Sequence, residues 1–307
     1  MSRYVFINDQ FIYESEAKLS IFDSSITSGD RTTEVARTFL HKPFKLELHI
    51  ERLYDGLQEL LIDINYSKNE ILQLTHELLE RNRVTEADDV EWQIVYIVTR
   101  GLESLFHLFE PSQYKPTIAI LCFPLKNRLG GMKEKYKNGV KLLFPSQRAI
   151  PNLLMAPQIK SRGRVHFKMA QLEIRKRDKE ATPLLLDYDD CVTETTGANI
   201  FFVKDNTLYT PSTSSVLSGI TRNYIMGLAG ELNIDVVEKK IPFHEVKEYQ
   251  EAFITSTIIG LVYVKQIENH TYLNGQRGPV TDQILKLFAE KVGVDFVTQS
   301  IGYVNSM

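Results

Sequence analysis

Five separated stretches of this 307-residue chain place chemically active side chains in apolar surroundings. In chain order they are His49–Leu53, Ile159–Ser161, Val192–Ile200, Leu217–Arg222 and Phe253–Thr257. A lysine in a partly apolar setting can act as a nucleophile and proton carrier, and a helix that begins after a glycine can bind an anion. Each stretch alone has an ordinary explanation, such as a solvated lysine, an ion-paired arginine or a helix start. Only the ordered set is informative.

The sequence lacks the motifs of several large enzyme classes. It has no Gly-x-x-x-x-Gly-Lys-Ser/Thr loop, no strand-linked Gly-x-Gly-x-x-Gly, no His-Glu-x-x-His and no Gly-x-Ser-x-Gly. His244-Glu245 has no second histidine at helical spacing, and the other histidines are scattered. We therefore expect no metal site, and no phosphate-loop, Rossmann, zincin or α/β-hydrolase enzyme.

The composition of the chain argues against nucleic acid and membranes as binding partners. The chain carries 36 Lys+Arg against 39 Asp+Glu, a formal charge of −3, which gives no basic surface for nucleic acid. Cys122 and Cys191 lie far apart without metal-type spacing, so we expect free thiols in a reducing compartment, the cytoplasm. No signal-like segment and no run of about 18 apolar residues occurs, so we expect neither export nor membrane insertion.

The elements that must position the five stretches suggest two domains. In the first third, short β-rich runs alternate with two amphipathic helices, which is typical of an α+β domain. The predicted strands are 4–8, 10–13, 90–99 and 116–125, and the predicted helices are 48–62 and 67–82. The capping-box pattern Ser67–Glu70 opens the second helix. An apolar stripe predicts the first helix and consists of Ile50, Leu53, Leu57, Leu60 and Leu61.

A polar stretch with two glycines, residues 128–137, is expected to connect this small domain, residues 1–127, to a larger β-rich domain, residues 138–307. In the larger domain the predicted strands are 140–144, 183–187, 199–203 and 208–210, and the predicted helices are 165–179, 221–232 and 280–292. Asp205-Asn206 predicts a tight turn between the last two strands. The predicted fold class is therefore α/β, of the mixed α+β kind.

Taken in order, the five stretches resemble the class IV aminotransferases, the pyridoxal 5′-phosphate (PLP) enzymes of fold type IV. This family includes branched-chain aminotransferases, D-amino acid aminotransferases and aminodeoxychorismate lyases. The most specific parts are Glu194–Phe201, Gly219–Arg222 and the His49–Leu53 signature. The resemblance implies two domains with the coenzyme between them. It also implies a homodimer, because sites of this fold type borrow a loop from the neighbouring subunit.

The resemblance also assigns roles in coenzyme binding. Lys160 would form the Schiff base with PLP and move a proton at the substrate Cα. Glu194 would keep the pyridine nitrogen protonated, and Leu217 would pack on the face of the ring. The phosphate group would be bound by Arg52, Ile220, Thr221 and Thr257.

The substrate side follows the family less closely. Branched-chain enzymes have a tyrosine a few residues after the lysine, whereas Ser161–His166 contains none. Arg164 resembles a basic residue that the lyases carry near this place. The lyases usually have a threonine in the first long loop, but Glu34 and Val35 stand where we align it. This difference argues against lyase activity.

The D-amino acid enzymes bind the substrate carboxylate with an arginine and a histidine that follow a Val-Thr-Arg-Gly segment. This chain has Val98–Gly101 and His107, with Leu105-Phe106 in place of the arginine and its neighbour. A bidentate guanidinium suits a carboxylate, so other cations become candidates. The candidate substrate ligands are Arg31, Arg37, Arg100, His107, Arg162 and Arg164.

We therefore predict an aminotransferase that moves an amino group between an amino acid and a 2-oxo acid. Branched-chain or other hydrophobic L-amino acids are the favoured substrates. The alternatives are an aminodeoxychorismate lyase, a D-amino acid aminotransferase and a homologue that binds coenzyme without chemistry. PLP is the expected cofactor, and a homodimer is the expected assembly.

Overall fold

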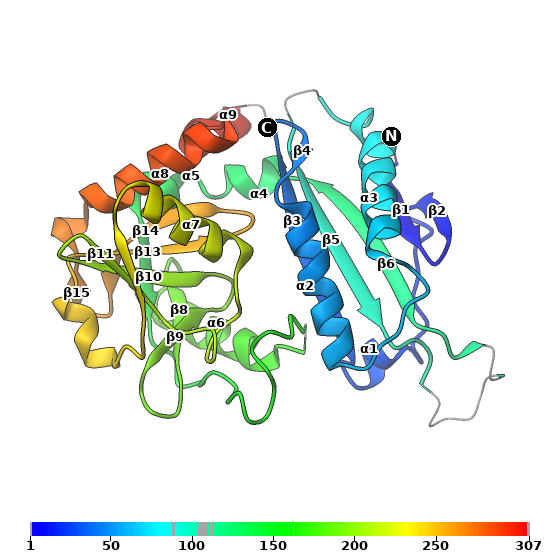
Figure 1. Ribbon diagram of the computed structural model, residues 1–307, viewed down its shortest axis with the longest axis horizontal. Helices are drawn as coiled ribbons and strands as arrows, with labels where there is room; N and C mark the ends of the chain where they lie inside the picture. The colour runs from blue at the N-terminus through cyan, green and yellow to red at the C-terminus, as the bar shows by residue number, and fades with distance from the viewer. Residues whose placement is uncertain (1, 88–89, 104–109, 111–112, 162, 306–307) are drawn as a thin grey trace. The chain divides into compact units, whose positions relative to one another are not determined.

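The computed structural model describes residues 2–87, 90–103, 110, 113–161 and 163–305, and the chain divides into two compact units (Figure 1). Unit 1 contains residues up to 125 together with 158–163, and unit 2 contains 126–157 and the residues from 164 onward. Among the helices of these described ranges, none is long and apolar enough to cross a membrane. Cys122 and Cys191 are free and buried.

Unit 1 is built on a six-stranded antiparallel sheet with the order β2-β1-β6-β5-β3-β4. Its strands are β1 Tyr4–Ile7, β2 Gln10–Tyr13, β3 Arg31–Phe39, β4 Lys42–Pro43, β5 Trp92–Thr99 and β6 Thr117–Pro124. Its helices are α1 Ser24–Thr27, α2 Leu46–Glu59 and α3 Lys68–Arg83. β4 pairs with the end of β3, at Thr38 and Phe39, so β5 is the only described strand of this sheet that pairs with the first half of β3.

The core of unit 1 lies between its sheet and helices α2 and α3, which lie along one face of the sheet (Figure 1). The predicted stripe supplies Ile50, Leu53 and Leu57 to this core. Leu61 was wrongly assigned to the stripe. It follows the end of α2 with φ 53° and is 84% exposed, because the helix has already ended at Glu59. The capping box is confirmed, since Ser67 and Glu70 satisfy each other's backbone amides at the start of α3.

Unit 2 contains a nine-stranded mixed sheet with the order β12-β11-β10-β13-β14-β7-β8-β9, and β15 also pairs with β14. Its strands are β7 Val140–Leu143, β8 Thr182–Leu186, β9 Val192–Thr195, β10 Asn199–Lys204, β11 Thr207–Thr210, β12 Asp235–Glu238, β13 Glu251–Ser256, β14 Gly260–Ile267 and β15 His270–Thr271. Asp205 and Asn206, both with positive φ, form the predicted turn between β10 and β11. Asn is among the residues that tolerate this conformation best.

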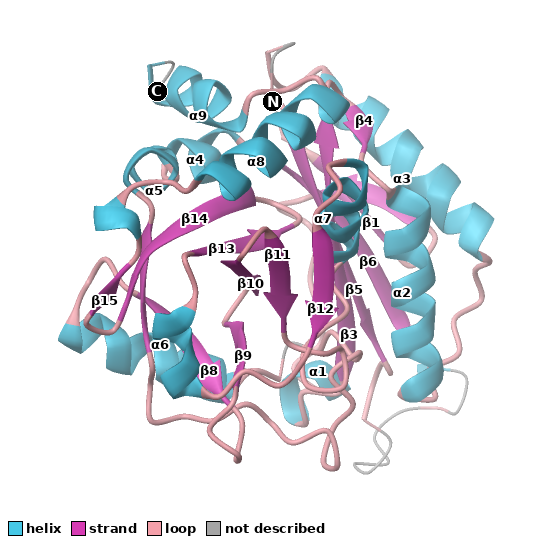
Figure 2. Ribbon diagram, turned by 60° about the vertical axis from the view of Figure 1, so that its left-hand side comes forward, coloured by secondary structure: helices cyan, strands magenta, loops and turns pink. Residues whose placement is uncertain are grey.

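The helices of unit 2 are α4 Lys126–Gly130, α5 Lys133–Asn138, α6 Val165–Arg177, α7 Ile220–Glu231, α8 Pro279–Val292 and α9 Phe296–Asn305, with 3₁₀ turns η3 Phe243–Glu248 and η4 Leu273–Gly275. Helices α7 and α8 pack against each other and against β13 (Figure 2). Residues 128–137, expected to connect the domains, lie in α4 and α5 and the turn between them. Leu129 and Tyr136 are buried, and the Tyr136 hydroxyl donates to the carbonyl of Ile259 at 2.8 Å.

Candidate active site

In unit 1, the predicted lysine binds a carboxylate that lies in the middle of strand β3. The Nζ atom of Lys160 lies 2.7 Å from Oε1 of Glu34, which is completely buried. Arg52 donates two hydrogen bonds to the same carboxylate, from Nε to Oε2 at 2.8 Å and from Nη2 to Oε1 at 2.8 Å. His49 Nδ1 lies 3.1 Å from Oε1. We call these four residues, Glu34, His49, Arg52 and Lys160, the Glu34 cluster.

Local structure explains why the side chains of the Glu34 cluster meet. His49 and Arg52 are three residues apart, so they lie on the same face of α2, which packs on β3. Lys160 arrives from a distant part of the chain. Its carbonyl oxygen accepts bonds from both the amide and the hydroxyl of Thr33, at 3.1 and 2.9 Å, and Ser161 forms a β-bridge with Thr32.

The charges in the cluster determine its protonation. Burial raises the pKa of Glu34, but the positive charges of Lys160 and Arg52 and the His49 hydrogen bond outweigh it and hold this pKa well below its ordinary value of 4.5. Burial lowers the pKa of His49 below 6.5, against the opposing hydrogen bond to Glu34. Glu34 is therefore ionised and His49 neutral near pH 7. Since a carboxylate only accepts, the His49 proton belongs on Nδ1.

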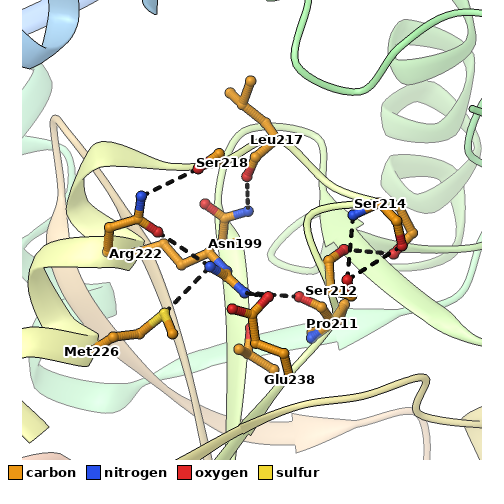
Figure 3. A network of polar contacts seen from close by, with 12 residues as sticks. Asn199, Pro211, Ser212, Ser214, Leu217, Ser218, Arg222, Met226 and Glu238 are labelled. Atoms are coloured by element: carbon orange, nitrogen blue, oxygen red, sulfur yellow. Dashed lines mark hydrogen bonds and ion pairs between the residues drawn. The ribbon is translucent and has the colours of Figure 1, made fainter.

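In unit 2, Asn199 organises the second group of predicted residues. Its side-chain amide donates to Oε2 of Glu194 at 3.2 Å and to the carbonyl of Leu217 at 3.0 Å, as Figure 3 shows for Leu217. Gly219 lies against the same side chain, because a Cβ added there would stand 2.1 Å from Asn199 Oδ1. A buried asparagine thus brings Glu194 in β9 together with the chain that leads into α7.

Gly219 is the N-cap of α7 and has no side chain with which to cap the first amides. Ile220 and Thr221 begin this twelve-residue helix and are buried. The first N–H groups of a helix and its dipole favour an anion. The start of α7 can therefore bind a phosphate group.

Arg222 fixes the same helix start from inside (Figure 3). It is 1% exposed, and its Nη2 donates to the carbonyl of Pro211 at 3.0 Å and to Glu238 at 2.7 Å. Its Nη1 lies 3.3 Å from the sulfur of Met226. The guanidinium joins the loop after β11, strand β12 and helix α7.

Thr257 follows strand β13 in the turn that leads to β14. Two residues before it, Thr255 is paired with Asn199 across the sheet, and its hydroxyl donates to the carbonyl of Gly260 at 2.7 Å. Within unit 2, the structure thus brings Glu194, Leu217 and the start of α7 around Asn199. It places Thr257 just beyond the strand that pairs with Asn199.

The candidate substrate ligands have different surroundings. Arg37 is fully buried, donates to the carbonyl of Thr38 and lies 3.9 Å from the Phe39 ring centroid. Arg100 is bound by Asp30 and by the carbonyls of Leu60 and Leu61.

Two further candidates differ in what surrounds their guanidinium groups. The Nε atom of Arg31 is buried and finds no partner among the described residues. Arg164, the N-cap of α6, lies over the ring of Phe167. His107 and Arg162 lie outside the described residues. The substrate role of each candidate stays a prediction.

Sequence reasoning missed Glu34 as a site residue, and with it the roles of Thr33 and His49. Residues 32–39 are all buried, so an acidic residue inside this run needs partners to offset its desolvation. A carboxylate within a β-rich run, together with the histidine and arginine of the His49–Leu53 signature, was the available signal.

Comparisons with known proteins all give aminotransferases. The family model described as "Amino-transferase class IV" matches residues 32–267. A protein of Methanocaldococcus jannaschii, provisionally named a branched-chain-amino-acid aminotransferase, is 33% identical over 93% of this chain and 95% of its own. The D-alanine aminotransferase of Listeria monocytogenes is 26% identical over 94% of this chain and 96% of its own. The crystal structure of the branched-chain aminotransferase of Thermoproteus uzoniensis with norvaline superposes with a TM-score of 0.83, at 25% identity, covering 99% of this chain and 98% of that one.

Proposed function

The chain belongs to the class IV aminotransferases, which are PLP-dependent enzymes, and from that premise we propose that it transfers the amino group of branched-chain or other hydrophobic L-amino acids to a 2-oxo acid. The observation that carries this substrate class is the likeness to relatives named for branched-chain amino acids, over nearly the whole chain. The likeness to a D-alanine aminotransferase supports D-amino acids as the second candidate.

The residues present fit the coenzyme on three structural grounds. Lys160 offers an amine next to a buried counter-ion, the start of α7 offers backbone amides for a phosphate, and Glu194 offers a carboxylate that is oriented by Asn199. When bound, the coenzyme supplies an aldehyde carbon for covalent attachment and a ring that draws electrons from the substrate Cα.

We assign the following tasks to the chain's own groups. Lys160 Nζ makes the covalent attachment and carries a proton to and from the substrate Cα. Glu194 keeps a proton on the pyridine nitrogen, and Leu217 packs on the ring. Arg52, held in place by Glu34, adds a charge to the phosphate ligands. The other phosphate ligands are Ile220, Thr221 and Thr257.

The test uses the full-length protein purified with PLP. We expect visible absorbance from the attached coenzyme and its loss in Lys160→Ala. Lys168→Ala, which removes an exposed lysine from α6, is the matched control and should keep the colour. A panel of L- and D-amino acids, read as bleaching of that absorbance without an acceptor, should respond most to leucine, isoleucine and valine. Stronger bleaching by D-alanine would replace the first substrate class by the second, and a colourless protein without affinity for PLP contradicts both.

We also infer a homodimer in the cytoplasm. Three consecutive large apolar side chains of unit 2 are exposed, at 92% for Leu153, 76% for Leu154 and 40% for Met155, which suits contact with a second copy. The free thiols of Cys122 and Cys191 suit a reducing compartment. Light scattering should give twice the chain mass, and Leu153→Ser with Leu154→Ser should lower it. Leu61→Ser, an equally exposed change in unit 1, should not.

A further inference from the structure

The Glu34 carboxylate accepts more hydrogen bonds than a single salt bridge would provide. Its Oε1 accepts from Lys160 Nζ at 2.7 Å, Arg52 Nη2 at 2.8 Å, His49 Nδ1 at 3.1 Å and the amide of Val35 at 2.7 Å. Its Oε2 accepts from Arg52 Nε at 2.8 Å. A buried carboxylate is costly unless it is fully hydrogen-bonded, and here five donor contacts offset that cost.

The charges around this carboxylate do not cancel. One negative charge faces the two positive charges of Lys160 and Arg52, while His49 is neutral. From β5, Tyr96 lies opposite Glu34 in the sheet. It is fully buried, its hydroxyl is within 2.7 Å of Thr75 Oγ1, and burial raises its pKa, so it adds no charge near neutral pH. Glu34 is therefore the counter-ion that the amine of Lys160 has in this cluster.

Two consecutive residues of β3 hold the two ends of the lysine. Thr33 binds its backbone carbonyl, and Glu34 binds its Nζ. The main chain and the amine are thus both fixed to one rigid strand. A flexible lysine side chain loses rotamer freedom when it is held in this way, which prepares it for reaction at one place.

We propose that Glu34 is the positioning residue of Lys160: in the coenzyme-free protein it holds the amine at one place in the charged form, so that attack on an aldehyde requires loss of a proton against this ion pair. The proposal rests on the proposed function for the role of Lys160. It assigns to Glu34 the control of how readily that amine becomes a nucleophile. An opposite charge in contact favours the charged form of an amine, and only the neutral amine attacks.

The test is the pH dependence of Lys160 acetylation in the full-length protein freed of coenzyme. Trace labelling with isotope-labelled acetic anhydride, read by peptide mass spectrometry, reports the neutral fraction of each lysine. In Glu34→Gln we expect the half-maximal labelling pH of Lys160 to fall by about one unit, which is about a tenfold faster reaction at neutral pH. The same half-maximal pH in Glu34→Gln and in the natural protein would overturn the proposal.

A matched control separates this effect from the loss of a buried carboxylate in general. Glu91, which is also buried in unit 1, binds the amides of Leu40 and His41 and the hydroxyl of Thr38. Glu91→Gln should leave Lys160 labelling unchanged, and an equal fall there would also overturn the proposal. Circular dichroism checks that both variants fold.

If Glu34→Gln does not fold, Glu34→Asp answers the same question, because the shorter side chain draws the charge away from Nζ. Its half-maximal pH should fall by a smaller amount, and an unchanged value contradicts the proposal. Failure of the proposed function gives a different result. Coenzyme attached to another lysine would refute the role of Lys160, yet the labelling of Lys160 would still report on Glu34.

Discussion

Thr33 binds the carbonyl oxygen of Lys160 twice, with its amide at 3.1 Å and its hydroxyl at 2.9 Å. Together with the Thr32–Ser161 bridge, this contact places the lysine segment beside the first half of β3. That half of the strand would otherwise have an open edge with unpaired backbone groups, which proteins usually cover. The edge of a sheet thus positions the residue that we propose as the covalent partner of the coenzyme.

Thr33→Val should loosen the lysine segment while preserving the shape of the strand. The change removes one partly buried hydrogen bond, so we expect a loss of about 1 kcal/mol in the free energy of unfolding. Because the lost bond holds Lys160, PLP should also bind more weakly. Absorbance titration with PLP and urea unfolding measure the two effects.

The matched control for Thr33→Val is Thr75→Val. Thr75 is a buried threonine of unit 1 whose hydroxyl binds the carbonyl of Ile71 and the hydroxyl of Tyr96. This variant should also lose stability, but its PLP affinity should stay the same. Equal losses of affinity in both variants would show that Thr33 acts only through general stability.

Gly219→Ala should disturb the start of α7 because of space rather than backbone strain, since φ is −67° at this residue. The added Cβ would stand 2.1 Å from Asn199 Oδ1, and the Asn199 side chain is tied to Glu194 and Leu217. We expect a loss of about 1–3 kcal/mol in the free energy of unfolding and weaker PLP binding.

Gly227→Ala in the same helix is the control for Gly219→Ala. No neighbouring atom lies within 4 Å of an added Cβ there, so helix propensity decides the result, and stability should rise by about 0.5–1 kcal/mol. Opposite signs in urea unfolding of the two variants are the expected outcome. A stabilising Gly219→Ala would contradict the role given to Asn199.

The sequence predicted correctly those structural elements that are determined by residues close together in the chain. The Ser67–Glu70 box starts α3, and Asp205-Asn206 makes the turn between β10 and β11, because each depends on residues only a few positions apart. Helices α4 and α5 had no such signal. They are short and polar, and long-range contacts stabilise them, such as the bond from Tyr136 to Ile259 and the bond from Ser300 to Leu129.

The same distinction applies to the site. The motifs pointed to Lys160 and Arg52, but not to the carboxylate that they share. Glu34 lies 126 positions before Lys160, and no periodicity links residues so far apart. Residues 32–39 are buried around this one acidic residue, and the partners that offset its desolvation are evident only in the folded structure. The role of such a residue is hard to predict from sequence, because it depends on tertiary contacts with residues far away in the chain.

Glu238→Ala should show how much the contacts of the Arg222 guanidinium, which joins α7 to β12 and to the loop after β11, contribute to the free energy of unfolding. Arg222 is almost fully buried, and the change removes its charged partner at 2.7 Å while the bond to Pro211 stays. Because the Glu238 side chain is 37% exposed, water replaces part of the lost contact, and we expect a loss of about 1 kcal/mol in urea unfolding. Asp189→Ala breaks the fully exposed pair with Lys240 and should change nothing measurable.

The stability of the protein should fall in two steps as the pH is lowered. His49 has a folded-state pKa below 6.5, so the unfolded chain takes up its proton first, and stability is lost as the pH falls below 6.5. Glu34 has a folded-state pKa well below 4.5, so its contribution is complete above 4.5 and is lost as the pH falls further. Urea unfolding at pH 7, 5.5 and 4 measures both steps.

Two variants assign the first of these steps to His49. In His49→Asn the amide can still donate to Glu34 but has no proton to gain, so the loss of stability between pH 7 and pH 5.5 should shrink. His76→Asn, which replaces an exposed histidine on α3, should keep the natural pH dependence. An identical slope in His49→Asn and the natural protein would mean that His49 is not the group that titrates. The burial of His49 would then contribute to stability through packing and not through its titration.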